Sequence, residues 1–186
     1  MWLAIPFEFL PLVGLLVALA ILKIVRISHD YVKRRIERAG GRVELDIWDD
    51  TYFVKLTSAD LLWCLSSLKY LIECNWLDLS STSISNADVK YLRCLRKSLE
   101  MLVVSDTCIS NDFVHGLSRF PRLYSLNLAR TIVSDDCIAA LATIPELRWV
   151  DLSGTDCTVE GIDRLRQLKP TCHILTGFID DRFQAE

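Results

Sequence analysis

The chain has 186 residues, of which 51% are apolar, and its formal net charge is −3 at pH 7. This length accommodates one ordinary domain with an appendage. Residues 39–186 carry 15 basic and 21 acidic side chains, the opposite of the basic footprint that nucleic-acid-binding domains show, so no nucleic-acid partner is expected.

An apolar segment opens the chain. Residues 2–22 contain one charged side chain, Glu8, and as a helix they would span roughly 30 Å, the thickness of the hydrocarbon core of a bilayer. We therefore predict a single transmembrane helix within residues 1–25. A cleaved signal peptide is the alternative, because Ala18-Leu19-Ala20 has the small-x-small form of a cleavage site, although no basic residue precedes the apolar run.

Residues 26–41 follow as a basic juxtamembrane linker or helix. Because the basic side of a span tends to stay in the cytoplasm, this segment predicts a cytoplasmic location for the rest of the chain. The same charges are candidates for binding anionic lipid headgroups, although they could serve only to set the topology. The candidate headgroup residues in and just before this segment are Lys23, Arg26, Lys33, Arg34 and Arg35.

Residues 42–70 are expected to form an N-terminal cap and a partial repeat. The stretches "GGRVELDI" and "TYFVKL" read as two strands around turn residues Asp49 and Asp50. The stretch Ser58 to Leu68 then reads as a short helix.

Residues 71–169 contain one pattern four times. The motif L-x-L-x-x-T begins at Leu77, Leu102, Leu126 and Val150, at spacings of 25, 24 and 24 residues. Such a period indicates a solenoid whose coils stack on one another. Each unit reads as a short strand, a threonine-bearing corner and a short helix with an apolar stripe.

Polar residues recur at fixed places in each unit. A threonine at the corner is expected to bond backbone groups of neighbouring coils, and a hydroxyl residue three positions later is expected to be the N-cap of the helix. The corner residues are Thr82, Thr107, Thr131 and Thr155, and the caps are Ser85, Ser110, Ser134 and Thr158.

These residues resemble the leucine-rich-repeat family, in the variant L-x-x-L-x-L-x-x-T-x-I-[TS]-D-x-x-L-x-x-L of ribonuclease-inhibitor-like and many bacterial repeat proteins. The resemblance covers Leu71 to Leu168, about half of the chain. Cys74, Cys157 and Val159 depart from the pattern, where the family has leucine, isoleucine and Asp or Asn. The resemblance to this family implies an α/β leucine-rich-repeat solenoid, with a parallel sheet and short outer helices. Residues 170–186 are expected to add a C-terminal cap strand and a polar tail.

The cysteine and histidine residues show no pattern typical of a metal site or a catalytic site. The seven cysteines form no C-x-x-C pairs, which disfavours a zinc site or a disulfide framework and favours free thiols in the core and a reducing cytoplasm. His29, His115 and His173 are far apart in the pattern. We expect no metal, no cofactor, no small-molecule substrate and no catalysis, and a thiol- or metal-dependent enzyme is the remote alternative.

The exposed face of the predicted sheet is the candidate binding site for a protein partner. Strand alternation places two tryptophans and a methionine on this face, with Asp and Asn between them, a composition typical of interaction surfaces. The predicted partner-binding residues are Trp76, Asp78, Met101, Asn127, Trp149 and Asp151. The sequence thus favours a membrane-anchored scaffold or recruitment module. The alternative is an accessory subunit of a membrane complex, whose span would pack through Gly14 and Ala18.

Overall fold

The computed structural model describes residues 30–46, 51–57, 61–68 and 74–177. The predicted transmembrane helix in residues 1–25, together with Lys23 and Arg26, lies outside these residues. Within the described part of the chain, no helix has the length and apolar character needed to cross a bilayer.

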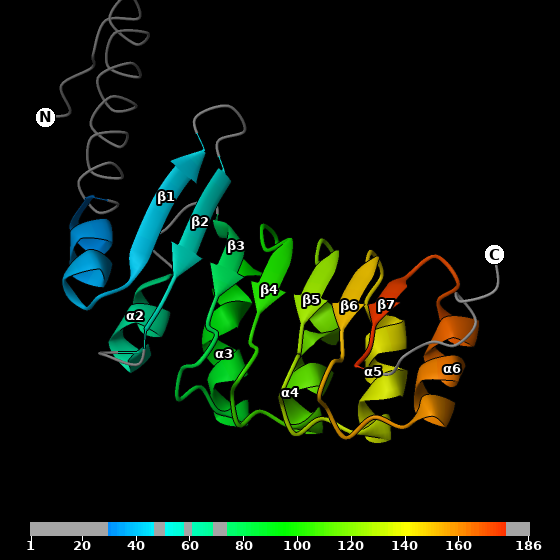
Figure 1. Cartoon of the computed structure of the whole chain (residues 1–186). Coiled ribbons are helices and arrows are strands. Elements are labelled where there is room, and N and C mark those ends of the chain that lie inside the picture. The colour runs from blue at the N-terminus through cyan, green and yellow to red at the C-terminus, as the bar shows by residue number, and fades with distance from the viewer. Residues whose placement is uncertain (1–29, 47–50, 58–60, 69–73, 178–186) are drawn as a thin grey trace, which may run out of the picture.

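The described strands form one sheet in chain order (Figure 1). The first two strands pair antiparallel, and every later neighbour pairs parallel. The strands are β1 (Arg42–Asp46), β2 (Thr51–Lys55), β3 (Cys74–Asp78), β4 (Met101–Val103), β5 (Ser125–Asn127), β6 (Trp149–Asp151) and β7 (His173–Leu175). β1, β2 and β7 thus lie in the three segments for which flanking strands are predicted.

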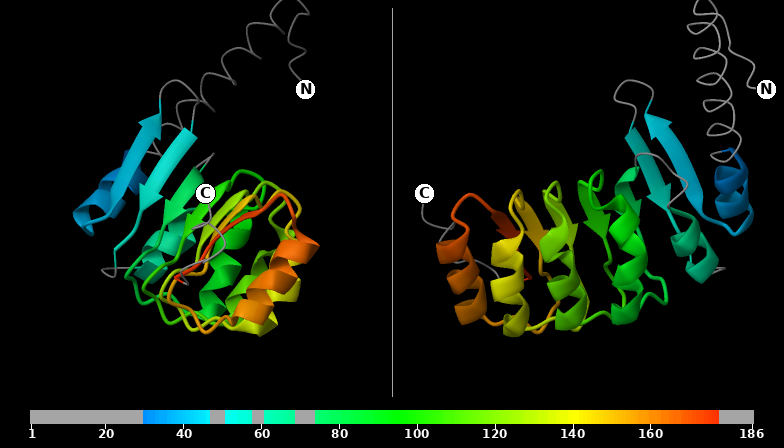
Figure 2. Two further views of the ribbon diagram at one scale, coloured as in Figure 1. Left: turned by 45° about the vertical axis from the view of Figure 1, so that its right-hand side comes forward. Right: turned by 180° about the vertical axis from the view of Figure 1, so that it is seen from behind.

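Short helices cover one face of this sheet and leave the other face open (Figure 2). The α-helices are α2 (Leu61–Ser67), α3 (Val89–Leu92), α4 (Asn111–Gly116), α5 (Ile138–Thr143) and α6 (Val159–Leu168). 3-10 turns extend several of them: η3 (Asn86–Asp88), η4 (Arg93–Leu95), η5 (Leu117–Arg119) and η6 (Asp135–Cys137). The predicted parallel sheet with short outer helices is therefore confirmed.

A continuous apolar core lies between the two layers. The central residues of consecutive strands pair in register, and each is at most 1% exposed: Leu77, Leu102, Leu126 and Val150. The largest fully buried side chains in the described part of the chain are Phe113 and Phe120, both in the second of the four repeats. Since no coil buries its apolar face alone, the coils are stable only as a stack.

The sequence predicts Ile162, Leu165 and Leu168 as the apolar stripe of the last repeat helix, and this stripe is only partly buried. Ile162 and Leu165 are buried, but Leu168 is 52% exposed. Leu168 is the final residue of α6, the last helix in the described part of the chain, so no following coil covers it there.

The chain leaves each repeat strand through a residue in the left-handed region. Ser81, Asp106, Arg130 and Gly154 occupy equivalent positions, with φ between 55° and 67°. The next residue is the corner threonine, whose hydroxyl donates to the carbonyl three residues earlier: Thr82 to Leu79, Thr107 to Val104, Thr131 to Leu128 and Thr155 to Leu152, at 2.6–2.7 Å. The acceptor lies in the same coil and not in the neighbouring coil that the sequence suggested, because the left-handed residue turns the threonine back onto its own strand end.

Neighbouring coils are joined by a different set of side chains. The amide of Asn86 bonds the N–H and hydroxyl of Ser110, and Asn111 does the same to Ser134. Asp135 accepts from the N–H and hydroxyl of Thr158 in the last coil. We call these three pairs the coil-joining ladder.

The hydrogen bonds at the starts of the repeat helices differ from those predicted for N-cap residues. The four predicted caps stand at the N-cap positions, and the hydroxyl of Thr158 accepts a hydrogen bond from the N–H of Gly161 at 3.1 Å. Ser85 forms a capping box with Asp88, whose carboxylate accepts the N–H of Ser85 at 2.9 Å. The side chains of Ser110 and Ser134 make no capping bond to their own helices. The hydroxyls of Ser110 and Ser134 accept from the preceding coil instead, and Ser85 donates its hydroxyl to Asp88.

Residues 30–38 form a helix that packs on the core beside α2. Val32 and Ile36 are buried in the core. The guanidinium of Arg35 lies 4.5 Å from the centre of the Trp63 ring, a cation–π contact. Part of the predicted basic linker is therefore an element of the folded domain.

Candidate functional site

The open face of the sheet presents two straight rows of side chains. They occupy the strand positions that flank the buried central residues, so they project away from the helices. The aromatic row is Phe53, Trp76, Met101, Ser125, Trp149 and His173. The polar row is Lys55, Asp78, Val103, Asn127, Asp151 and Leu175.

The two tryptophans of the aromatic row pack on neighbours yet remain open to solvent. Trp76 meets Phe53 edge-on, with ring centroids 4.7 Å apart, and is 42% exposed. Trp149 stacks on His173 at 4.4 Å with a tilt of 33°, and is 49% exposed. These contacts hold each indole in place while leaving about half of it available, as in the preorganised aromatic anchors of binding surfaces.

Three residues of the polar row also hold the strand ends. The Oδ1 atoms of Asp78, Asn127 and Asp151 each accept the N–H of the second residue onward at 2.9 Å. These bonds satisfy backbone donors where the strand ladder stops. Asp78, Asn127 and Asp151 therefore have a structural role at the strand ends, and their partner-binding role stays a prediction.

Asp78 has further partners. Its Oδ2 accepts from the Lys55 ammonium at 2.7 Å and its Oδ1 accepts from the Ser80 hydroxyl at 2.6 Å. Burial alone would raise the pKa of this carboxyl, but the hydrogen bonds from Lys55 and Ser80 outweigh burial and hold the pKa below its ordinary value of 3.8.

A shallow hollow of about 320 Å³ lies on the same face, over β4 to β7. Its walls combine the side chains of Met101, Tyr124 and Leu175 with Trp149, and Asn127 and Asp151 supply polar groups. An apolar hollow with a few polar groups fits an apolar anchor side chain from a partner, with the amide and carboxylate directing its polar neighbours.

The predicted residues divide between this hollow and the β3 end of the sheet. Met101, Asn127, Trp149 and Asp151 line the hollow. Trp76 and Asp78 lie on β3 beside the N-terminal cap. Sequence reasoning missed Phe53, Lys55, Tyr124, His173 and Leu175; extending the strand register into the flanking strands would have identified all except Tyr124, which precedes β5.

Comparison with known proteins gives a likeness of fold alone. No protein-family model and no curated protein matches the chain. Solved structures do match: a leucine-rich-repeat protein of Leptospira interrogans has 16% identity and a TM-score of 0.43, and an internalin of Listeria monocytogenes has 15% identity and a TM-score of 0.42. The matches cover 59% of this chain, and 33% and 36% of the other two, so this chain spans about a third of their length.

The predicted headgroup residues that the structure describes are partly engaged within the domain. Lys33 lies 4.0 Å from Glu37, one helical turn away, and Arg35 covers Trp63. Arg34 is exposed. A lipid-binding role for these three residues stays a prediction.

The prediction that the cysteines are core residues is wrong for two of the seven. Cys64, Cys74, Cys137, Cys157 and Cys172 are buried, but Cys94 and Cys108 are exposed, so these two do not act as core residues. Burial raises the pKa of the Cys74 thiol. Among the described residues, no three His, Cys, Asp or Glu side chains gather as a metal site would require.

Proposed function

We propose that this chain is a protein-interaction module that binds another protein through the open face of its sheet. The observation that carries the proposal is the aromatic row: two tryptophans held by neighbouring rings, each about half exposed, on the open face of the sheet beside an apolar hollow. Exposed apolar area of this kind marks interaction sites on soluble surfaces. The module acts as a scaffold and has no catalytic activity of its own.

We further propose that residues 1–25 anchor the module as a single transmembrane helix, with the repeats in the cytoplasm. The proposal rests on the apolar run of residues 2–22 and the basic residues that follow it. The exposed thiols of Cys94 and Cys108 provide the test. A membrane-impermeant maleimide should label them only after the cells are permeabilised, and labelling of intact cells would contradict the orientation.

The interaction surface is tested by the double substitution Trp76→Ala, Trp149→Ala. It should abolish partner capture by the membrane-embedded protein, whereas the melting temperature should change little, because both side chains are about half exposed. The matched control is Ile132→Ala, Leu168→Ala, which removes two apolar side chains elsewhere that are slightly more exposed than the tryptophans. Equal capture by both double variants would reject the open face as the binding site.

A second candidate role is that of an accessory subunit in a larger membrane complex. Gly14 and Ala18, four residues apart in the apolar segment, favour close helix packing. Size-exclusion chromatography after mild detergent extraction separates the two roles. A subunit should co-migrate with partners in fixed ratio even when Trp76 and Trp149 are replaced, whereas a recruiting module should lose its partner.

A further inference from the structure

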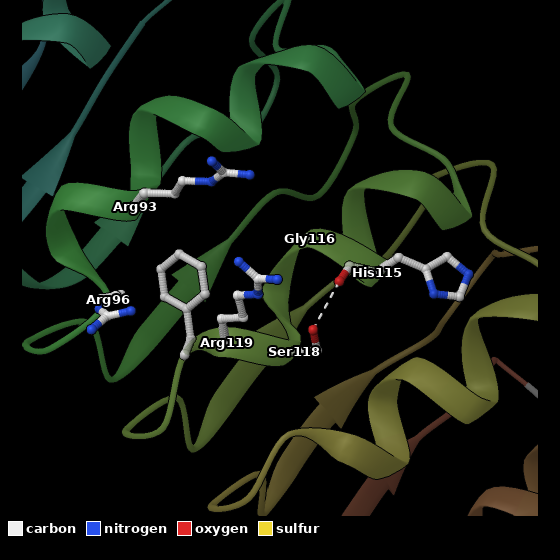
Figure 3. A pocket seen from close by; sticks show the side chains of 7 residues that line it. Arg93, Arg96, His115, Gly116, Ser118 and Arg119 are labelled. Carbon is white, nitrogen blue, oxygen red and sulfur yellow. Dashed lines mark hydrogen bonds between the residues drawn. The ribbon is translucent and has the colours of Figure 1, made fainter.

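A second hollow lies on the helical side of the solenoid, away from the open sheet face. It has a volume of about 580 Å³ and lies between the ends of two neighbouring helical segments, η4 and η5 (Figure 3). Its lining residues are Arg93, Arg96, His115, Gly116, Ser118, Arg119 and Phe120.

Basic residues are concentrated here in a chain that is acidic as a whole. Residues 89–99 contain Lys90, Arg93, Arg96 and Lys97 and no Asp or Glu. Residues 113–123 of the next coil likewise contain basic residues and no Asp or Glu. The acidic residues that flank these two stretches are Asp88, Glu100 and Asp112. Glu100 forms an ion pair with Arg122, which does not line the hollow, and Asp88 accepts from the N–H and hydroxyl of Ser85.

Among the described residues, none forms a carboxylate ion pair with the three arginines of the hollow. Within the described parts of the chain, ion pairs occupy Arg42, Arg122, Arg130, Arg148 and Arg166, but none involves Arg93, Arg96 or Arg119. Three cations facing a common space repel one another unless an anion lies between them. The hollow therefore favours a negatively charged ligand.

The arrangement of the two coils brings these cations together. Figure 3 shows Arg93 from one coil and Arg119 from the next extending into the space between them, with His115 directed away beyond Gly116. A side chain at Gly116 would begin 2.7 Å from a methyl group of Val89. Glycine at this position thus permits the close approach of the two helices that sets the arginines across the hollow.

We propose that this arginine hollow binds a ligand that carries two or more phosphate groups. Guanidinium presents a planar fork of donors that fits phosphate oxygens in pairs, a geometry that favours phosphate over a single chloride-like ion. The volume is in the range of small-molecule sites and exceeds what one inorganic phosphate needs. A soluble organic polyphosphate and the headgroup of a phosphorylated inositol lipid share this chemistry.

The test is a titration of the full chain in neutral detergent micelles with two probes, by isothermal calorimetry. Inositol hexakisphosphate represents the soluble source, and a short-chain phosphatidylinositol bisphosphate represents the lipid source, with short-chain phosphatidylcholine as the blank. Binding of the soluble probe indicates a soluble ligand. Binding of the lipid probe alone indicates a headgroup held together with its glycerol backbone.

Two variants locate the binding. Replacing Arg93, Arg96 and Arg119 by Gln should weaken binding more than about 100-fold, since each charge-assisted contact contributes about tenfold. The matched control replaces Arg42, Arg148 and Arg164 by Gln. These arginines are exposed and lie outside the hollow, and their replacement changes the net charge by the same amount. It should change affinity less than about twofold, because these arginines do not line the hollow and salt screens exposed charges that do not contact the ligand.

A third variant tests whether the paired donors of guanidinium or only its positive charge bind the ligand. It also replaces the Gln variant as the test if that variant folds poorly. Arg93→Lys, Arg96→Lys and Arg119→Lys together keep the charge but remove the paired donors, and should weaken binding about tenfold. Three results would overturn the proposal: no binding of either probe by the wild-type chain, equal losses in the hollow and control variants, or unchanged affinity in the Gln variant. Partner capture through the sheet face is a separate readout, so failure here leaves that proposal standing.

Discussion

Asp135 accepts hydrogen bonds from both the N–H and the hydroxyl of Thr158, at 2.8 Å and 2.7 Å, across the boundary between the last two coils. Asn86 and Asn111 make the equivalent pair of bonds at the two preceding boundaries. The coils of this solenoid are thus joined by side chains at the helix starts as well as by the sheet and the core. This relationship makes the stack sensitive to single substitutions at the coil-joining ladder.

Asp135→Ala should lower the free energy of unfolding by about 1–3 kcal/mol, because two donors of Thr158 lose their acceptor. The control is Asp135→Asn. An amide occupies this place in the two earlier coils, where its oxygen accepts the N–H and its NH₂ donates to the hydroxyl, so Asn should retain most of the stability. Thermal or urea unfolding of the full chain in detergent measures both. An Asp135→Ala variant as stable as the wild-type chain would show that this pair of bonds contributes nothing, and equal losses in the two variants would contradict the equivalence of Asn and Asp at this position.

Gly161→Ala should destabilise the last coil through the same aspartate. A Cβ at Gly161 would lie 2.0 Å from Oδ1 of Asp135, so the carboxylate would have to move from its place against Thr158. Overpacking of this kind costs about 1–3 kcal/mol. If the clash is the cause, adding Gly161→Ala to an Asp135→Ala background should cost far less, and full additivity in this double-mutant cycle would refute the steric explanation.

Asp78 should make the fold less stable in acid. Its pKa is held below the ordinary value of 3.8 in the folded state, so its contribution is fully present above that value and is lost as the pH falls through the lower folded pKa. Lys55→Met removes one of the donors that lower this pKa, and should move the Asp78 carboxyl pKa upward in an NMR titration. The melting temperature of Asp78→Asn should accordingly fall less between neutral pH and pH 3 than that of the wild-type chain. A parallel acid response in the two proteins would contradict this assignment.

Thiol reactivity should divide the seven cysteines into two classes. Cys94 and Cys108 are exposed and should react with a maleimide within minutes in the native protein. The other five are buried, and the hydrogen bond from Cys137 to Cys157, together with burial, raises the pKa of Cys137, so they should react only after unfolding. Mass spectrometry with and without denaturant counts the modified sites. Rapid native labelling at a buried position would reveal local opening of that coil.

The repeat could be located from sequence because it follows from short-range patterns. Apolar residues at strand and helix spacing recur at one period, so Leu77, Leu102, Leu126 and Val150 were identifiable as core positions, and each is buried. The left-handed corners were harder to recognise. Glycine is the residue that usually indicates a left-handed backbone conformation in a sequence. Only one of the four corners has it, Gly154, and the other three are Ser81, Asp106 and Arg130.

Contacts between coils were the part that sequence did not reveal. The ladder bonds join residues 23 or 24 positions apart. The residues next to Asn86 in the sequence do not show whether its side chain bonds Ser110 or is solvated at the start of its helix. The arginine hollow likewise depends on the distance between two helices. The outer members of the aromatic row, Phe53 and His173, lie on the flanking strands β2 and β7, and extending the strand register from the repeats into these strands would have identified them.

Site-specific photo-crosslinking tests the central claim most directly. A photoreactive amino acid replaces Ser125, at the middle of the aromatic row, or Ala139, an exposed position on α5 on the opposite side. After illumination of native membranes, a protein partner bound to the open face should be crosslinked from position 125 and not from position 139, and the Trp76→Ala, Trp149→Ala change should abolish that product. A partner crosslinked from position 139 alone, or a product at position 125 that survives the loss of both tryptophans, would contradict the assignment of the sheet face as the interaction surface.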